Sequence, residues 1–417
     1  MSTHGRKELY RVPAPAGPER DRGRKDDSNK IVFLSGTRTP FGAVGGAFRD
    51  MAGMDLAVHS AKAAIDQAGL SDRRDLIDTV IMGNAMHTSI DSHYGARHVA
   101  LKSGLSYYST ALTVNRICWS GAEAIVLGAK ELLAGEANVV LAGGYESTSQ
   151  SPMVVYGAAW GFPYMAGPRA MFVFRDGLND TFINTDMMGT AENLARYYGI
   201  TRAEADEFAL SSQMKAADAR TRCRLSAEIT PVKIPGKRSD VIVQDDENPK
   251  PETTLQTLSR LQAVKPGGVH TAGNSSGIVD GAAAVIMTTA ARAKELGIKP
   301  IGELLSWGVA GVDPHYMGIG PVPASLAALR RAGMNLGDLD HIEVNEAFGG
   351  QYLAVERELN LDRSKVNLNG GAIAFGHPLG ATGARMTVAL LRLGGVGLAS
   401  ACIGGGQGGA IIVKSAQ

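Results

Sequence analysis

The sequence contains little cysteine, almost no net charge and no long apolar run. The three cysteines in 417 residues include no Cys-x-x-Cys pair, which argues against a metal site of that kind and favours a reducing, intracellular compartment. Forty-two basic and 41 acidic residues leave a net charge of +1, so no global field attracts nucleic acid or an anionic membrane. No apolar stretch is long enough to span a bilayer. These absences predict a cytoplasmic protein with neither nucleic acid nor a membrane as a partner.

Residues 1–29 lack the apolar segment that a secretory signal requires. They are rich in Arg, Lys, Glu and Asp and include Pro13, Pro15 and Pro18, a composition typical of disorder. The acidic residues also argue against a mitochondrial transit peptide. The sequence therefore predicts a disordered tail over residues 1–29.

Glycine, by contrast, is abundant. The 52 glycines gather in short motifs and not in repeats, which excludes collagen and flexible linkers. With 44% hydrophobic and 20% charged residues, the composition is that of a soluble globular protein. A chain of 417 residues is long enough for two or three packed units.

Apolar runs typical of strands alternate with helical patterns early in the chain. Strands are expected at 31–35, 79–82 and 138–141, and helices at 56–68 and 121–134. Alternation at this spacing indicates an α/β architecture with substantially parallel strand pairing.

Residues 148–278 interrupt this alternation. They begin with Met, Pro, Trp and other aromatic residues, continue through a polar helical stretch at 201–220, and end in segments rich in proline and charge. Long insertions of this kind often cover active sites. We expect an inserted, partly irregular cap.

The strand–helix alternation resumes after residue 300, and two features recur. A strand that ends in Asn occurs at 78–84 and 340–345, and a strand followed by cysteine occurs at Cys118 and Cys402. This predicts one duplicated α/β unit. The expected domains are a first half at 30–147 plus 279–299, a cap at 148–278 and a second half at 300–417.

Cys118 lies where a β-like run gives way to small residues that open a helical pattern. Unpaired backbone N–H groups and the positive end of a helix dipole favour thiolate over thiol at such a position. A thiolate is a strong nucleophile, so the position suggests covalent catalysis. The alternative is a small buried core cysteine.

His377 is framed by glycine-rich turns just before a predicted helix, and Pro378 fixes the backbone after it. A neutral imidazole can take a proton from a thiol, and an imidazolium stabilises a thiolate. Cys402 precedes three glycines, whose backbone N–H groups can converge on an oxygen in the way an oxyanion hole requires. Cys402 is thus a candidate second acid or base. The alternatives are a hydrogen-bonded core histidine and a buried structural thiol.

Two further segments carry small or polar residues at ends of predicted strands. Asn345 can orient a water or bond an oxyanion, although turn chemistry alone also explains an Asn there. The small residues of 271–284 allow a ligand or another chain to approach the backbone closely. Helix capping by Ser276 or Asp280 is the alternative.

Together these segments resemble the thiolase family. The resemblance runs from residue 30 to 415 and rests on Asn-Arg-x-Cys-x-Ser-Gly, Asn-Glu-Ala-Phe, Gly-His-Pro-x-Gly and Cys-Ile-Gly-Gly-Gly, in that order. Residues 96–99 and 318–323 are most similar to the 3-ketoacyl-CoA thiolases of fatty-acid β-oxidation. The resemblance implies an α/β fold of two βαβαβ halves packed back to back, in a five-layered αβαβα arrangement with an inserted cap.

The resemblance also implies a catalytic role for each motif. Cys118 attacks the 3-keto carbonyl, releases acetyl-CoA and holds the remaining acyl group as a thioester. His377 activates Cys118, and Cys402 exchanges the proton at C2 of acetyl-CoA. Asn345, through a water, forms one oxyanion hole with His377, and the N–H groups of Cys118 and Gly404 form the other.

Coenzyme A enters as a substrate, and no metal or redox cofactor is implied. Ser276 is expected to contact the pantetheine arm, while Ala347 and Phe348 lie near the CoA tail. Lys237 or Arg238, in the cap, are candidates for the CoA phosphates. The remaining residues expected to line the substrate site are Ala272, Ile278, Leu178, Met188 and Met317.

The sequence departs from the family in four places. Trp119 follows the nucleophile where a small residue is usual, and its ring is expected to narrow the acyl site or to reshape a subunit contact. His270 stands where an aliphatic residue is usual, the stretch between Arg385 and Cys402 is short, and the N-terminal tail is extra.

The resemblance therefore implies an acyltransferase that cleaves 3-ketoacyl-CoA with CoA, or runs the reverse Claisen condensation, as a homodimer or homotetramer. A short-chain acetoacetyl-CoA thiolase and a catalytically silent acyl-CoA-binding protein are the alternatives. A condensing enzyme that acts on acyl-carrier protein is expected to lack Cys402 in its glycine setting.

Overall fold

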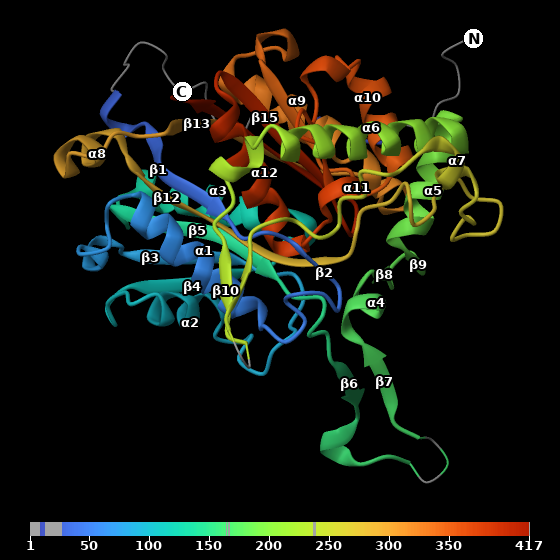
Figure 1. The fold of residues 1–417 in the computed structure, drawn as a ribbon, viewed down its shortest axis with the longest axis horizontal. Coiled ribbons are helices and arrows are strands. Elements are labelled where there is room, and N and C mark those ends of the chain that lie inside the picture. The colour runs from blue at the N-terminus through green and yellow to red at the C-terminus, as the bar shows by residue number, and fades with distance from the viewer. Residues whose placement is uncertain (1–8, 13–26, 164, 166, 237–238, 417) are drawn as a thin grey trace.

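The fold consists of two α/β halves that pack against each other, with a long insertion in the first (Figure 1). The computed structural model describes residues 9–12, 27–163, 165, 167–236 and 239–416. The strands of the first half are β1 (Ile31–Arg38), β2 (Gly42–Ala43), β3 (Thr79–Gly83), β4 (Thr110–Val114), β5 (Val139–Glu146) and β12 (Val279–Thr289). Those of the second half are β13 (Gly302–Gly311), β14 (His341–Val344), β15 (Val396–Ile403) and β16 (Gln407–Ser415).

The two halves share one strand order, as the predicted duplication requires. The first half runs β1-β12-β5-β3-β4 and the second runs β13-β16-β15-β14, with corresponding pairs in the same relative direction. A parallel bridge between Ile342 and Val366 stands where the fifth strand of the second half would pair. The halves join where β1 pairs with β13 over two residue pairs.

Strand direction differs from the expectation of substantially parallel pairing. Among the described strands, only β3 with β4, β3 with β5 and β14 with β15 pair in parallel. The last two strands of the second half form a tight hairpin, and β12 enters the first half only after the insertion. Both arrangements return the chain antiparallel to its neighbours.

Helices form three layers around the two half-sheets, in agreement with the expected five-layered arrangement. The outer helices of the first half are α1 (Gly53–Gln67), α2 (Gly95–Lys102) and α8 (Ala290–Leu296). The central helices are α3 (Ser120–Ala134) and α12 (Leu379–Leu393), and the outer helices of the second half are α9 (Pro321–Ala332) and α10 (Gly349–Leu359). Buried apolar residues form one large cluster in each interlayer region, and the central one joins α3 and α12 to both half-sheets.

Glycine lets α3 and α12 cross closely at the centre of the molecule. A Cβ on Gly121 would lie 2.6 Å from the carbonyl oxygen of Gly380, and one on Gly383 would lie 2.7 Å from the backbone N of Ala122. The crossing brings the start of α3, just after Cys118, against the start of α12, just after His377.

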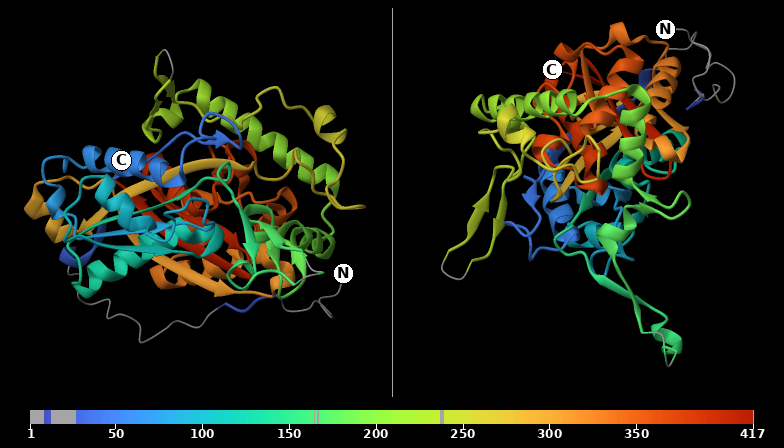
Figure 2. Two further views of the ribbon diagram at one scale, coloured as in Figure 1. Left: turned by 90° about the horizontal axis from the view of Figure 1, so that it is seen from below. Right: turned by 90° about the vertical axis from the view of Figure 1, so that its right-hand side faces the viewer.

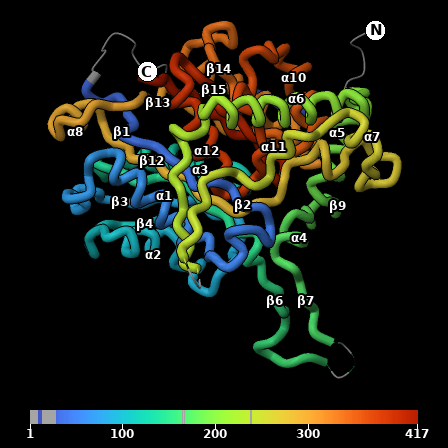
Figure 3. Tube along the Cα trace, viewed as in Figure 1, coloured from blue at the N-terminus to red at the C-terminus, as the bar shows by residue number. Residues whose placement is uncertain are grey.

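The insertion lies between β5 and β12, close to the predicted cap limits, but its helices pack on the second half. It contains β6 (Met153–Tyr156), β7 (Arg169–Phe172), α4 (Val173–Gly177), β8 (Asn179–Asp180), β9 (Thr185–Asp186), α5 (Met187–Tyr198), α6 (Arg202–Thr221), β10 (Val232–Ile234), β11 (Val241–Val243) and α7 (Leu255–Ser259). The Cα trace in Figure 3 places α5 and α6 beside α10 and α11 (Ala372–Phe375), which they contact. The β6–β7 hairpin instead projects away from the body of the molecule (Figure 2).

Part of the N-terminal tail is ordered, which corrects the prediction of disorder over residues 1–29. Leu9 is buried in the core of the second half, and Tyr10 pairs with Val312. The Tyr10 hydroxyl also donates to Glu358 at 2.8 Å. An apolar and an aromatic residue among the charged ones explain this docking. Residues 1–8 and 13–26 lie outside the described residues.

No helix in the described part of the chain combines the length and apolar character that a bilayer crossing needs.

Candidate active site

The residues singled out in the sequence stand mostly at strand ends and helix starts on both halves. Cys118 follows β4 and precedes α3, and Asn345 follows β14. Cys402 lies on β15, Gly404 lies in the turn from β15 to β16, and His377 comes just before α12. Each therefore has its backbone fixed by an element of one half-sheet or by the central helix pair.

Cys118 lies in a tight turn, Ile117–Trp119, that leads directly into α3. Ile117, a β-branched residue, adopts a positive φ of 44°, a conformation that costs roughly 1–3 kcal/mol for such side chains. Ser120 holds the turn from below, because its hydroxyl donates to the Ile117 carbonyl at 2.7 Å and accepts from the Arg116 N–H at 2.8 Å. The backbone at the candidate nucleophile is thus strained, and the hydrogen bonds of Ser120 hold it in that conformation.

The Cys118 thiol is a poor acid in this setting, which corrects the expectation that the helix start favours thiolate. Burial raises its pKa to about 12, and this effect outweighs the N–H groups of Gly404 and of Cys118 itself, which bond the sulfur. The apolar neighbours Ala85 and Leu379 contribute to that burial. A protonated thiol follows at neutral pH, so a base must remove its proton.

His377 has the tautomer of a base. Its Nδ1 lies 2.6 Å from the Thr382 hydroxyl oxygen. The Thr382 hydroxyl donates its own hydrogen bond to the Pro378 carbonyl at 3.0 Å. Thr382 therefore accepts from Nδ1–H, and the proton is assigned to Nδ1 on this network. The opposite nitrogen, Nε2, carries a lone pair and faces the Asn345 amide nitrogen at 3.3 Å.

His377 is also neutral. Burial, and then the positive charge of Arg385, lower its pKa to about 3. With the thiol protonated as well, the resting pair is thiol and imidazole and not an ion pair. Sequence reasoning did not find Thr382, whose only signal is its place one turn into the helix that follows His377.

Asn345 joins this network from β14. Its backbone N–H donates to the Ser400 carbonyl at 2.9 Å, which fixes it beside β15. Its side-chain Oδ1 is buried and accepts no hydrogen bond from the described residues. Its role in holding a water stays a prediction.

Cys402 is fully buried among Met317, Ala347 and Phe348, three residues expected near the substrate. Burial raises its pKa well above the ordinary value, and the charge of an ionised Cys118 raises it further, so the two thiols interact. Met187 also packs in this cluster, and its sulfur lies 3.2 Å from the position of a Cβ on Gly404. The sequence pointed to Met188, which is half-buried; the side chain at Met187 was missed.

The other residues predicted to contact the substrate differ in their neighbours and in their exposure. Ser276 donates its backbone N–H to the Ala347 carbonyl at 3.0 Å, and Leu178 packs against the apolar residues around Cys118. Ala272 and Ile278 are exposed. Lys237 and Arg238 lie outside the described residues.

Glu146, at the end of β5, is a further buried group that sequence reasoning missed. Its carboxylate accepts N–H groups of Ala85, Met86 and Gly380 at 3.0–3.1 Å and the amide of Asn84 at 2.8 Å. Burial nevertheless raises its pKa to about 7. Glu146 thereby ties the loop beside Cys118 to the turn that follows His377.

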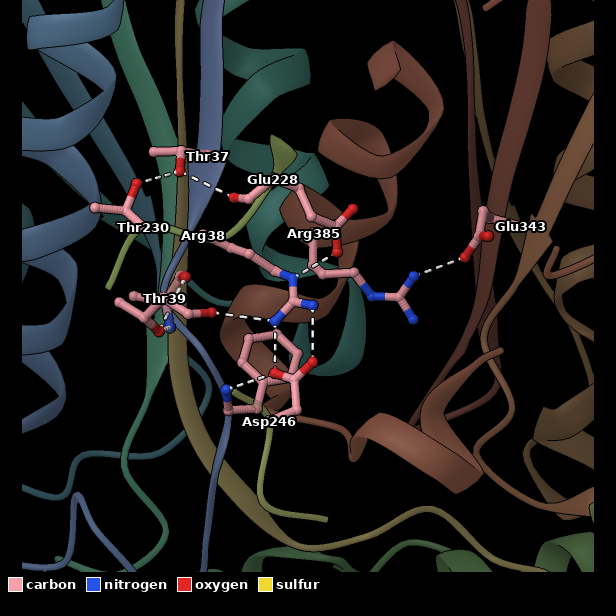
Figure 4. A network of polar contacts seen from close by, with 10 residues as sticks. Thr37, Arg38, Thr39, Glu228, Thr230, Asp246, Glu343 and Arg385 are labelled. Carbon is pink, nitrogen blue, oxygen red and sulfur yellow. Dashed lines mark hydrogen bonds and ion pairs between the residues drawn. The ribbon is translucent and has the colours of Figure 1, made fainter. Parts of the chain in front are cut away.

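Two buried arginines, Arg38 and Arg385, lie close to one another and bind carboxylates near the segment that precedes His377 (Figure 4). Arg38, on β1, contacts Glu228 at 2.7 Å and binds Asp246 through two nitrogens at 2.6 and 2.9 Å, both carboxylates coming from the insertion. Arg385 binds Glu343 at 2.7 Å. The guanidinium carbons of both arginines lie within 5.8 Å of the ring centre of Phe375, two residues before His377.

The two unusual residues noted in the sequence are both buried. Trp119 is fully buried in the central core, where its ring packs against Gly409. His270 bonds Glu192 through Nδ1 at 2.9 Å and accepts the Gly350 N–H at Nε2 at 3.2 Å, which fixes the start of α10.

Comparison with known proteins agrees with this geometry. The model of the thiolase N-terminal domain matches residues 31–291, and that of the thiolase C-terminal domain matches residues 298–415. Human mitochondrial 3-ketoacyl-CoA thiolase is 44% identical over 391 residues, covering 92% of this chain and 98% of the human one. The acetyl-CoA acetyltransferase of Cupriavidus necator is also 44% identical, over 92% of this chain and 99% of its own.

Solved structures give the same result. The crystal structure of human mitochondrial 3-ketoacyl-CoA thiolase in complex with CoA superposes with a TM-score of 0.90 at 42% identity, covering 94% of this chain and 99% of that one. The acetyl-CoA acetyltransferase of Bacillus anthracis superposes equally well, with a TM-score of 0.90 at 38% identity, over 93% of this chain and 98% of its own. With both domain models matched in order and the fold reproduced over nearly its whole length, this chain belongs to the thiolase family.

Proposed function

We propose that this protein catalyses the CoA-dependent thiolytic cleavage of 3-ketoacyl-CoA to acetyl-CoA and a shortened acyl-CoA, and its reversal. The observation that carries the proposal is His377, whose Nδ1 bonds the Thr382 hydroxyl so that Nε2 carries no proton, together with the packing of Ile117, the residue before Cys118, against Gly404. A nucleophile, a base and backbone donors for a developing charge are the groups that acyl transfer to a thiol requires.

In the first half-reaction, Nε2 of His377 takes the thiol proton as the Cys118 sulfur attacks the C3 carbonyl. We propose that the N–H groups of Cys118 and Gly404 bond the C3 oxygen, which carries the negative charge of the tetrahedral adduct. The C2–C3 bond then breaks, and Cys402 supplies the proton that completes acetyl-CoA at C2. The acyl group stays on Cys118 as a thioester.

In the second half-reaction, the Cys402 thiolate takes the proton of a new CoA thiol, whose sulfur attacks the acyl-enzyme. Cys118 leaves as a thiolate and regains its proton from His377. Every proton is then back where it started, so the cycle balances without any further reactant. We propose that no metal or redox cofactor takes part, and dialysis against EDTA should leave turnover unchanged.

The test is turnover of 3-ketoacyl-CoA substrates of four to sixteen carbons with free CoA, beside a Cys118→Ala control. Cleavage that vanishes in the control supports the proposal. A profile confined to four carbons supports the alternative of a short-chain acetoacetyl-CoA thiolase; the Cupriavidus necator relative is named acetyl-CoA acetyltransferase. Binding of acyl-CoA without turnover at any length supports the silent binder.

We also propose that the protein assembles as a homodimer or homotetramer. The projecting β6–β7 hairpin exposes apolar side chains, with Trp160 95% exposed at its end. Strand β4 is an edge strand, and Tyr108 just before it is 95% exposed. Unpaired edges and clustered apolar residues are surfaces that subunit contacts cover. Analytical ultracentrifugation at micromolar concentration tests this, and a monomer there contradicts it.

We propose a cytoplasmic location and a role in fatty-acid degradation. Three unpaired cysteines, two of them in the proposed site, support a reducing compartment. The human relative is named as mitochondrial, so imaging of the tagged protein in its own cell is the test. Recovery in an organelle contradicts the proposed location.

A further inference from the structure

Three residues in or next to the Ile117–Trp119 turn, which holds Cys118, contact the β15–β16 hairpin of the other half. Arg116 donates to the side chain of Gln407 at 3.0 Å. Cγ2 of Ile117, the residue before Cys118, lies 3.6 Å from the position of a Cβ on Gly404. The Trp119 ring lies directly over Gly409. The hairpin that carries Gly404 is thus the surface against which Trp119 packs.

The contact between Trp119 and Gly409 leaves no free space. A Cβ on Gly409 would lie 2.5 Å from three atoms of the indole ring, closer than real Cβ atoms approach their neighbours. The ring is fully buried in the central apolar core, so it cannot swing into solvent to make room. Gly409 is also paired across the hairpin with Ala401, the residue before Cys402. The position of the indole ring is therefore fixed by the position of the hairpin.

Because the turn is strained, the contact between Trp119 and Gly409 affects the position of Cys118. Ile117 is held at a positive φ, and such a backbone persists only where surrounding contacts over-determine it. Trp119 closes this turn and is the largest fully buried side chain of the protein's described part. A shift of the ring is transmitted through one peptide bond to the sulfur.

We propose that Trp119 and Gly409 form a size-matched pair that positions the Cys118 sulfur against the Gly404 N–H. Trp119 is a positioning residue: it touches no reacting atom, and it acts by setting the distance between the turn of one half and the hairpin of the other. The pair explains why a bulky residue follows the nucleophile here. This inference concerns the site of the proposed function, but it rests on geometry and can fail or hold independently of turnover.

The test is a reciprocal pair of substitutions. Gly409→Ala adds one methyl group under the ring and is expected to displace the turn. The double variant Trp119→Phe with Gly409→Ala trades the added methyl for a smaller ring and is expected to restore it. Gly311→Ala is the matched control, since it adds the same methyl on neighbouring β13 where no atom lies within 4 Å.

The main readout is the rate of Cys118 alkylation by iodoacetamide across pH, resolved by peptide mass spectrometry. Cys223 is exposed and serves as the internal reference in each sample. A hydrogen bond to a charged group is worth roughly a ten-fold change or more in the thiolate population. We expect Gly409→Ala to lower the Cys118 rate about ten-fold relative to Cys223, the double variant to recover most of that loss, and Gly311→Ala to change nothing.

Alkylation needs no substrate, so it separates this inference from the proposed function. If the wild type turns over no 3-ketoacyl-CoA but the alkylation pattern holds, only the proposed function fails. If Gly409→Ala alkylates and turns over like the wild type, or if the double variant is no better than Gly409→Ala, the pairing is wrong. Should Gly409→Ala not fold, Trp119→Phe alone must still slow Cys118 alkylation relative to Cys223, and an unchanged rate overturns the proposal.

Discussion

Replacing Thr382 by valine isolates the hydrogen bond that sets the tautomer of His377. Valine has nearly the same shape, so the change removes the hydroxyl and little else. The Nδ1–H of His377 then loses its acceptor at 2.6 Å inside a buried site. Leaving a buried donor unpaired costs about 1–3 kcal/mol.

The imidazole can respond in two ways, and both make His377 less able to act as a base. It can keep its tautomer and bear that cost, or it can move the proton to Nε2, where the Asn345 amide nitrogen already faces it. Either response lowers the fraction of His377 that can accept a proton from Cys118. A cost of about 1–3 kcal/mol corresponds to a loss of roughly 5- to 150-fold in kcat/KM.

The assay is steady-state cleavage of a 3-ketoacyl-CoA with CoA, with kcat and KM measured separately. Thr387→Val is the matched control: it is the same substitution in the same helix, Thr387 is fully buried, and among the described residues its hydroxyl bonds only the Gly383 carbonyl, at 2.9 Å. We expect kcat to fall in Thr382→Val and to hold in the control. Activity of Thr382→Val within two-fold of the wild type would refute the assignment of a neutral, Nδ1-protonated base.

Three other predictions follow from buried charges. Because the pKa of Cys118 is about 12, its alkylation rate should climb about ten-fold per pH unit from pH 7 to 9.5, and a plateau near pH 8.5 would contradict this. The pKa of Glu146 is about 7 when folded against 4.5 as the ordinary value, so this group contributes stability that is full below pH 4.5 and lost as the pH rises through 7. Urea unfolding should therefore show up to about 3 kcal/mol more stability at pH 5 than at pH 8 from this group, a difference that Glu146→Gln abolishes; an equal difference in the variant counts against it. Arg38→Met should lower the free energy of unfolding by about 3–5 kcal/mol, because it leaves the two carboxylates around it buried without a cation; a loss below about 1 kcal/mol would show that they become neutral at no cost.

Local elements were predictable from the sequence. The helix expected at 121–134 runs from Ser120 to Ala134, and the predicted strand at 79–82 is Thr79–Gly83, because apolar periodicity and glycine stops are local signals. Cys118, His377 and Asn345 also stood out as candidates by local signals, since each lies in a short motif at a strand end or a helix start.

Properties that depend on distant segments were not predictable in this way. The direction in which strands pair depends on which strand joins the sheet after the insertion, and the sequence of a single strand does not identify its partner. The thiolate expected at Cys118 gave way to a buried thiol, because residues far along the chain, such as Leu379, cover it. The direction of the Trp119 ring likewise depends on a glycine almost 300 residues away.

The place of β12 in the first half-sheet has a consequence for synthesis of the chain on the ribosome. β12 lies between β1 and β5, yet about 130 residues separate the end of β5 from its start. At about 5–20 residues per second, roughly 10 s pass before it can emerge. During that time both edges of β1 and one edge of β5 have no strand to pair with, so the nascent first half presents open edges to other chains. Chaperone engagement at those edges is expected to last until β12 leaves the exit tunnel, and a chain halted within the insertion cannot complete its first domain.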